Sequence, residues 1–194
     1  MEFAMQKFLK ISILILSLVF YTAVLAQDSA AKNFKADDPV LITSAGQSAD
    51  ILMAKILAKK ASVRYAFNKV ASTSDLDTVK SIIIVCGGST KGLGAAKIDK
   101  VEEYQRVEKL IKAARKRSLK IIAVHVGGKS RRGALSDYFN KLVADNADHL
   151  IVVKGGNEDG FFTKIAKEKK IGIDLPEKIV EIQPIFEKIY STKP

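Results

Sequence analysis

The chain has a single cysteine in 194 residues, no tryptophan and only five tyrosines. One cysteine excludes an intramolecular disulfide framework, so the fold must be held together by its hydrophobic core. The shortage of aromatic side chains leaves little support for an aromatic platform that binds sugars. Because 47% of the residues are hydrophobic and 27% are charged, the chain has the composition of one globular domain and not of a disordered or fibrous protein.

The cysteine itself, Cys86, ends the apolar run Ser81-Ile82-Ile83-Ile84-Val85-Cys86. A catalytic cysteine needs a neighbouring base and an electropositive, partly open setting. Free cysteines are more often small buried side chains. We therefore predict that Cys86 is a buried residue at the end of a strand.

The chain has fewer acidic residues (21) than lysines and arginines (32), which gives a formal charge of +11. This charge favours anionic partners without identifying one. The basic cluster at 115–117 ends a helical segment in which basic residues alternate with glutamates, and no aromatic residues accompany it, so we predict no specific nucleic-acid partner. Salt-sensitive attachment to an acidic envelope polymer or membrane remains a weaker alternative.

The N-terminus has the pattern of a secretory signal peptide. Lys7 and Lys10 precede an uncharged run of 16 residues, 11–26, which ends in small residues before the polar Gln27. This run is shorter than the ~20 residues of a typical membrane-spanning helix, so cleavage after Ala26 is favoured over retention as an anchor. The expected organisation is a signal peptide at 1–26, a polar tether at 27–38 and one α/β domain at 39–194, secreted or otherwise extracytoplasmic.

The rest of the chain alternates short apolar runs with helix-length amphipathic segments. The apolar runs lack polar alternation, which indicates parallel strands that are covered on both faces. Strands are expected at 40–43, 63–67, 82–86, 121–126 and 150–153. Helices are expected at 48–60, 99–118, 136–146, 161–169 and 184–190, with a short turn of helix near 74–79.

This pattern predicts an α/β fold, a three-layer sandwich with a mainly parallel five-stranded sheet of flavodoxin-like or Rossmann-like order. The simplest strand order is 2-1-3-4-5. In such folds, ligands bind outside the carboxyl ends of the strands, near the switch between strands one and three.

Glycine-rich loops follow the expected strands at that edge of the sheet. Gly-Gly pairs at 87–88, 127–128 and 155–156 each come after a strand, before polar residues and another glycine. Such loops expose backbone N–H groups to an anion, although tight strand-to-helix turns also use glycine. The candidate ligand-binding residues are Ser44, Gly46, Gln47, Gly87, Gly88, Ser89, Lys91, Gly127, Gly128, Arg131, Arg132 and Asn157, and Lys129 adds charge to the same rim.

Familiar nucleotide and catalytic motifs are missing. No Walker motif is present, the glycines at 87–94 fail the G-x-G-x-x-G spacing, and no serine lies in G-x-S-x-G. We therefore expect no cofactor and assign no catalytic residue. His125 and His149 fall at opposite ends of neighbouring strands, about 15 Å apart at ~3.3 Å per residue, so no metal site is expected.

Several long runs resemble one exported bacterial family, domain-of-unknown-function family 6305. The resemblance covers nearly all of the chain after residue 38. It implies a small extracytoplasmic α/β domain, and no activity, cofactor or catalytic residue comes with it. The runs that carry it are 39–50, 87–96, 127–137, 156–160 and 163–168.

Two classes of function follow from these residues. The first is a noncatalytic binding domain for a small anionic molecule, a carboxylate or phosphate, at the glycine-rich cationic strand ends. The alternative is a hydrolase or transferase that acts on a phosphorylated or carboxylated small molecule, with His125 or Asp137 as the proton-transfer group. The oligomeric state does not follow from the sequence.

Overall fold

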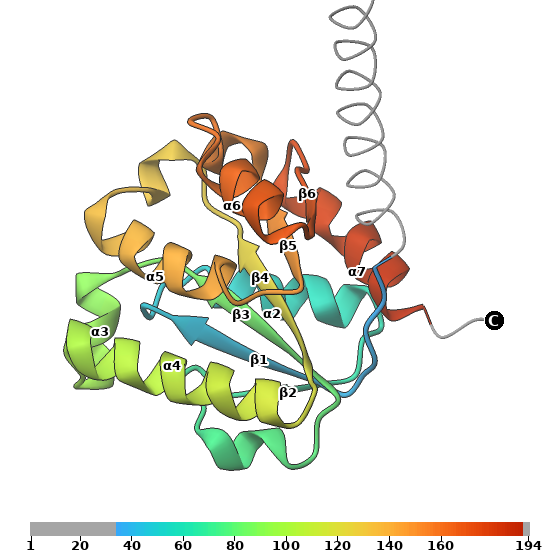
Figure 1. Ribbon diagram of the computed structural model, residues 1–194, viewed down its shortest axis with the longest axis horizontal. Coiled ribbons are helices and arrows are strands. Elements are labelled where there is room, and N and C mark those ends of the chain that lie inside the picture. The colour runs from blue at the N-terminus through green and yellow to red at the C-terminus, as the bar shows by residue number, and fades with distance from the viewer. Residues whose placement is uncertain (1–33, 192–194) are drawn as a thin grey trace, which may run out of the picture.

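The computed structural model describes residues 34–191, which form one six-stranded sheet in the order β2-β1-β3-β4-β5-β6 (Figure 1). Every pair of neighbouring strands is parallel. The predicted α/β class and the order 2-1-3-4-5 are confirmed, and the predicted five strands are corrected to six. The strands are β1 (Val40–Ala45), β2 (Tyr65–Phe67), β3 (Ser81–Cys86), β4 (Lys120–His125), β5 (His149–Val152) and β6 (Gly172–Asp174).

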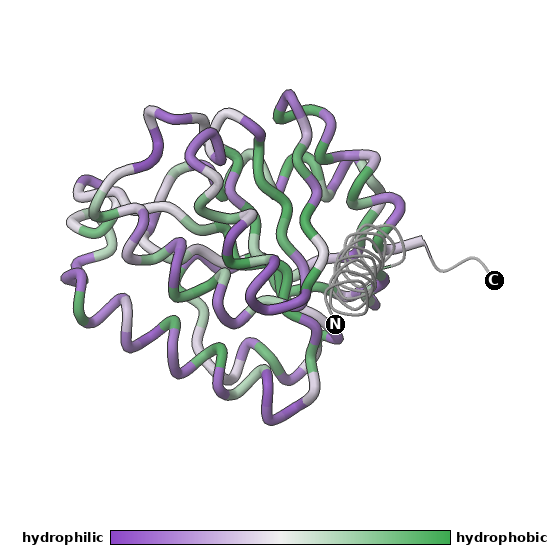
Figure 2. The backbone as a smooth tube through the Cα atoms, turned by 45° about the horizontal axis from the view of Figure 1, so that its top comes forward, coloured by the Kyte–Doolittle hydropathy of each residue, from purple (hydrophilic) through white to green (hydrophobic). Residues whose placement is uncertain are grey.

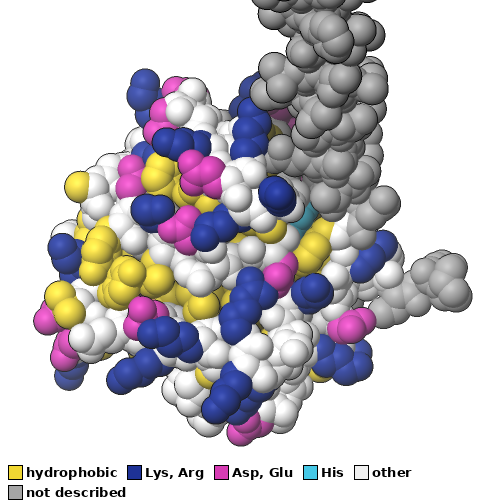
Figure 3. Space-filling model, viewed as in Figure 1, with side chains coloured by type: hydrophobic (Ala, Val, Ile, Leu, Met, Phe, Trp, Pro, Cys, Tyr) yellow, Lys and Arg dark blue, Asp and Glu magenta, His cyan; other side chains and the backbone are white. Residues whose placement is uncertain are grey.

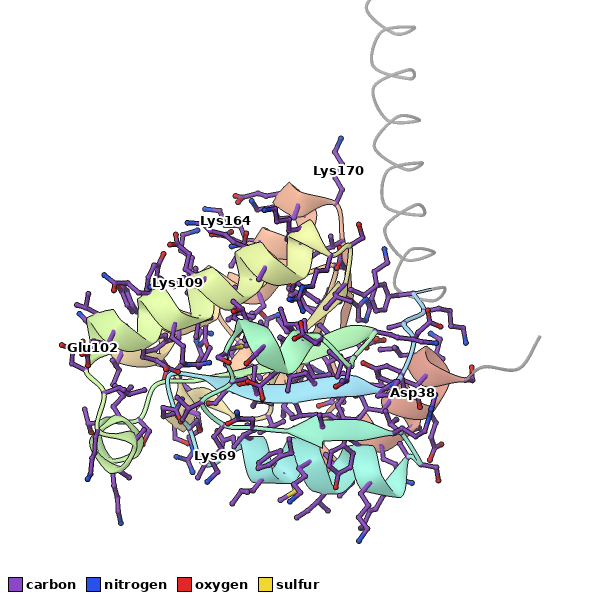
Figure 4. The ribbon with its side chains drawn as sticks, turned by 90° about the horizontal axis from the view of Figure 1, so that it is seen from below. Asp38, Lys69, Glu102, Lys109, Lys164 and Lys170 are labelled. Atoms are coloured by element: carbon purple, nitrogen blue, oxygen red, sulfur yellow. The ribbon has the colours of Figure 1, made fainter. Side chains whose placement is uncertain are left out.

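Helices cover both faces of this sheet and make a three-layer sandwich. Figure 4 shows the sheet nearly edge-on, with α4, which carries Lys109, on one side and α2 on the other. The α-helices are α2 (Ile51–Lys60), α3 (Thr90–Ala96), α4 (Lys100–Lys116), α5 (Ala134–Ala144), α6 (Phe161–Lys169) and α7 (Ile182–Tyr190). Short 3₁₀ turns are η1 (Thr73–Leu76), η2 (Lys129–Arg131), η3 (Lys154–Gly156) and η4 (Ile179–Glu181).

The strands β1 to β5 contribute to two hydrophobic cores, because successive side chains point to opposite faces. Ile82 and Ile84 pack in the core under α4, α5 and α6, whereas Ile83 and Val85 pack in the core under α2 and α7. The strands are accordingly the hydrophobic centre of the molecule in Figure 2. Burial on both faces is the physical reason why these runs lack polar alternation.

Two elements were missed by the sequence analysis. The helix α3 contains Gly92 and Gly94, and glycine is among the poorest helix formers. The strand β6 is three residues long, begins with Gly172 and is only partly buried. Both elements depend on neighbouring elements for their stability, so the local sequence pattern did not predict a helix or a strand at these positions.

Part of the predicted tether packs on the domain. The ring of Phe34 stacks on that of His149, with 4.6 Å between centroids and 9° between planes, and the N–H of Ala36 donates to the carbonyl of Ile189 at 3.1 Å. The predicted signal peptide at 1–26 lies outside the described residues. Within residues 34–191, none of the helices has the length and apolar character needed to span a bilayer.

Candidate functional site

The loops after β1 and β3 close over the switch point of the sheet. Gln47 and Gly88 form an antiparallel bridge, and the N–H of Ser89 donates to the carbonyl of Gly46 at 2.8 Å. Gly46 has a φ of +90°, and a Cβ there would lie 2.5 Å from the Phe139 ring. Glycine at this position is therefore required by conformation and by packing.

A carboxylate of the chain itself occupies the anion position beside β1. The fully buried Glu103 accepts hydrogen bonds at Oε1 from the N–H of Gly46 and from Gln47 Nε2, each at 2.9 Å. Arg106 donates to the same carboxylate from Nε at 2.7 Å and from Nη2 at 2.8 Å. The donors that the sequence analysis assigned to a ligand here are already satisfied by Glu103.

The remaining predicted residues at β1 and β3 have structural contacts or face away. The N–H of Gly87 donates to the Ala45 carbonyl at 3.0 Å, and Ser89 Oγ caps α3 by accepting from the Gly92 N–H at 3.0 Å. Ser44 is fully buried and its Oγ has no partner within the described residues. Lys91 is exposed on α3.

An open hollow lies further along the same edge, at the carboxyl ends of β4 and β5. The turns η2 and η3 lie side by side there and connect these strands to α5 and α6 (Figure 1). The hollow has a volume of about 430 Å³, which is within the usual range for small-molecule sites. Its lining residues are Lys129, Arg132, Asp137, Gly155, Gly156, Glu158 and Asp159.

Arg132 forms the wall of this hollow and is held by two carboxylates. Its Nε donates to Asp137 at 2.5 Å, and Nη1 and Nη2 each donate to Asp159 at 3.0 Å. Nη1 also donates to the Gly156 carbonyl at 2.6 Å, and the guanidinium lies over the ring of Phe161. Although burial opposes the charged form, the hydrogen bonds that Arg132 donates to both carboxylates raise its pKa above the ordinary value. The side chain is 10% exposed, so its charge is largely used within the fold.

The other cations of this loop are open to solvent. Arg131 lies 3.8 Å from Asp50 and its side chain is 58% exposed. Lys129 lies 3.7 Å from Glu158 and is 84% exposed. Such exposed pairs contribute little to stability, so both cations remain available to a ligand.

Gly128 stands out among the glycines of this edge, because neither backbone conformation nor packing requires it. Its φ of −82° suits any residue, and a Cβ there would meet nothing within 4 Å. Packing does not require a glycine at Gly155 either, because a Cβ built there would have the Gly128 Cα as its nearest neighbour, at the ordinary contact distance of 3.7 Å. Within residues 34–191, the N–H groups of Gly127 and Gly128 have no hydrogen-bond acceptor. Bare backbone without a hydrogen-bond acceptor in the described residues therefore lies beside the hollow, next to its lining residues Lys129 and Gly155.

Asn157, the last predicted residue, caps α6. Its Oδ1 accepts from the N–H of Phe162 at 2.8 Å, and its Nδ2 donates to Thr163 Oγ1 at 2.6 Å. Oδ1 also accepts from the N–H of Thr163 at 3.3 Å, so the side chain satisfies two N–H groups in the first turn of the helix. The side chain positions the loop beside the hollow and is not among the residues that line it.

His125 and Cys86 lie beneath the hollow. His125 Nδ1 is 2.9 Å from the Cys86 carbonyl oxygen, and because that oxygen only accepts, Nδ1 carries the proton and Nε2 is the free acceptor. Within the described residues Nε2 has no partner, and Gly156 covers the ring. Burial lowers the pKa of His125 and raises that of Cys86 to about 12. The prediction that Cys86 is a buried residue at the end of a strand is confirmed.

The buried His125 makes stability depend on pH. Because its folded-state pKa lies below the ordinary 6.5, the unfolded chain takes up the proton first as the pH falls below that value, and the fold loses stability. We expect the free energy of unfolding to drop by about 1 kcal/mol between about pH 7 and pH 5.5 from this residue. Urea unfolding of the protein and of His125→Asn measures it. An equal pH dependence of stability in the two proteins would contradict the assignment to His125.

The two residues proposed for proton transfer in the enzymatic alternative are both engaged in the fold. His125 has no exposed surface. Asp137 lines the hollow, but its Oδ1 accepts from Arg132 and from Asn140 Nδ2 at 3.1 Å, and its Oδ2 accepts from Arg132 at 3.3 Å. Among the described residues, no group of three or more histidine, cysteine, aspartate or glutamate side chains is arranged to hold a metal ion.

The structure thus divides the predicted site. Of the predicted residues, Arg132 lines the hollow, and Gly128 lies beside the lining residue Gly155. Gly127 and Arg131 contact each other in the same loop but are not part of the lining. The structure uses Gly46, Gln47, Gly87, Gly88 and Ser89 to join two loops. The sequence analysis missed Gly155, Gly156, Glu158 and Asp159 as lining residues. The third Gly-Gly pair, Gly155-Gly156, indicated that this loop belongs to the same edge. The residues that follow it, Glu158 and Asp159, are acidic and did not match the cationic rim that the sequence analysis expected.

Comparison with known proteins gives a family and no function. A family model described as "Domain of unknown function (DUF6305)" matches residues 37–190. No curated protein and no solved structure matches the chain.

Proposed function

We propose that this chain, which belongs to the DUF6305 family, is an exported, noncatalytic domain that binds a small molecule through an anionic group. The site is the hollow between η2 and η3. Export rests on the signal-peptide pattern of residues 1–26, which lie outside the described residues.

The unconstrained glycine Gly128 is the observation that carries the proposal. A glycine costs backbone entropy, yet nothing in the fold uses its freedom or its lack of a side chain. Its N–H and that of Gly127 point to no acceptor within the described residues. Close approach of a ligand to this backbone would account for both facts.

The neighbouring charges favour a carboxylate over a phosphate. Lys129 and Arg131 are exposed beside the bare backbone and supply positive charge. The lining as a whole has two cationic and three acidic side chains, and the acids would repel a doubly charged phosphate more strongly than a singly charged carboxylate.

We expect Gly128→Ala to weaken carboxylate binding at least about tenfold, because the methyl group would occupy the space that the ligand needs. The fold should be unaffected, since that space is empty. Titration of acetate, butyrate, succinate and inorganic phosphate, followed by NMR shifts of backbone amides, measures the affinity.

Gly94→Ala is the matched control. Gly94 also has open space around it but lies in α3, away from the hollow, so binding should persist and the helix should gain about 0.5–1 kcal/mol. If none of the anions shifts the amides of the η2 and η3 loops, or if both variants bind equally well, the proposed site is wrong.

A further inference from the structure

One exposed ion pair spans the mouth of the hollow. Lys129 belongs to the turn after β4, and Glu158 to the loop after β5, and their charged groups are 3.7 Å apart. Both side chains are mostly exposed, at 84% and 60%, and at 3.7 Å the pair is longer than a charge-assisted hydrogen bond. Solvated pairs of this kind are easily separated.

The other two acidic side chains of the lining are not free in the same way. Asp137 and Asp159 both accept from Arg132. The hydrogen bond from Arg132 lowers the pKa of Asp159, so that carboxylate stays ionised near neutral pH. One cation and one anion, Lys129 and Glu158, are therefore the uncommitted charges of the lining.

A ligand with only negative charge fits this arrangement poorly. Its carboxylate would gain Lys129 and the bare backbone of Gly128, but it would enter beside Glu158 and Asp159. Like charges a few ångströms apart are unfavourable where solvent is partly excluded. Acidic side chains lie among the basic ones on the face of the molecule seen in Figure 3.

We infer that the ligand is a zwitterion, a small molecule that carries a carboxylate and an ammonium group. It inserts between Lys129 and Glu158, with the carboxylate on Lys129 and the Gly128 N–H and the ammonium on Glu158. Each charge of the separated pair then gains a new partner of opposite sign. This inference rests on the proposed function, because it assumes that the hollow is the ligand site.

Matched probes of equal length test it. The purified protein is titrated with 4-aminobutyrate, butyrate and butylammonium, and with the shorter series of β-alanine, propionate and propylammonium, while NMR follows the amides of Gly128 and Gly155. We expect the zwitterion of at least one series to bind about tenfold more tightly than either singly charged partner. If butyrate binds as tightly as 4-aminobutyrate, the zwitterion inference is overturned and the carboxylate site stands. If no probe shifts these amides, both proposals fail.

Two variants separate the roles of the two charges. Glu158→Gln should remove the advantage of the zwitterion over the carboxylate, and Lys129→Gln should weaken both of these probes. Lys164→Gln and Glu168→Gln serve as controls that should bind as the parent protein does. Both residues are exposed on α6 and are not among the lining residues, and Lys164 is labelled in Figure 4. An unchanged preference for 4-aminobutyrate in Glu158→Gln would overturn the assignment of the ammonium to that residue.

Discussion

Replacing Glu103 with glutamine is expected to lower the free energy of unfolding by about 4 kcal/mol, since it leaves a mostly buried guanidinium without its counter-charge. Glu103 is fully buried and accepts four hydrogen bonds, from Gly46, Gln47 and two nitrogens of Arg106. A glutamine side chain has one acceptor oxygen and would place an NH₂ group against donors. Urea denaturation of the two proteins measures the difference.

Glu108→Gln is the control in the same helix. Glu108 is exposed and pairs with Lys112 four residues on, an arrangement that contributes about 0.3–0.5 kcal/mol. If the two substitutions cost the same, the buried carboxylate does not hold the β1 loop to α4 as the structure indicates.

The second large effect is expected at Arg132, where alanine should cost about 3 kcal/mol of unfolding free energy. The substitution removes hydrogen bonds to Asp137, Asp159 and the Gly156 carbonyl and the contact with Phe161. The estimate is below that for Glu103, because water can solvate the more exposed Asp159 once the arginine is gone. Thermal or urea unfolding checks it.

The neighbouring Arg131→Ala is matched in chemistry and differs in burial. Arg131 is exposed and lies 3.8 Å from Asp50, so its replacement by alanine should lower the free energy of unfolding by less than about 1 kcal/mol. The pair of variants also separates stability from binding, because Arg131 is the one whose loss should weaken carboxylate binding in an intact fold. Equal destabilisation by the two alanines would mean that the wall of the hollow does not depend on Arg132.

Much of the fold follows from local sequence. The continuous apolar runs around Ile83 and Ile122 specified covered parallel strands, because two-sided burial leaves no position for a polar side chain. The amphipathic segment of α4 was predicted within two residues at either end, helped by the cap at Asp99. The short β6 and the glycine-containing α3 were not predicted from the sequence, because partners distant in sequence stabilise them.

The sequence also indicated the edge of the sheet at which we propose the site, but not the position of that site along the edge. Parallel strands end at one edge, so loops with similar sequences were expected to meet there. Which loops close and which stay open depends on groups elsewhere in the chain. Glu103, 57 residues after Gly46, fills the first position, and Asp159, 27 residues after Arg132, takes up a predicted ligand cation.

The sequence by itself determined the layered α/β architecture, the strand order of its first five strands and the edge that carries the glycine-rich loops, because these depend on periodicity and chain direction. Only the tertiary structure decided which charges are free. An arginine has the same local signature whether it faces solvent, as Arg131 does, or two carboxylates, as Arg132 does. The difference comes from long-range pairing, which adjacent residues do not encode.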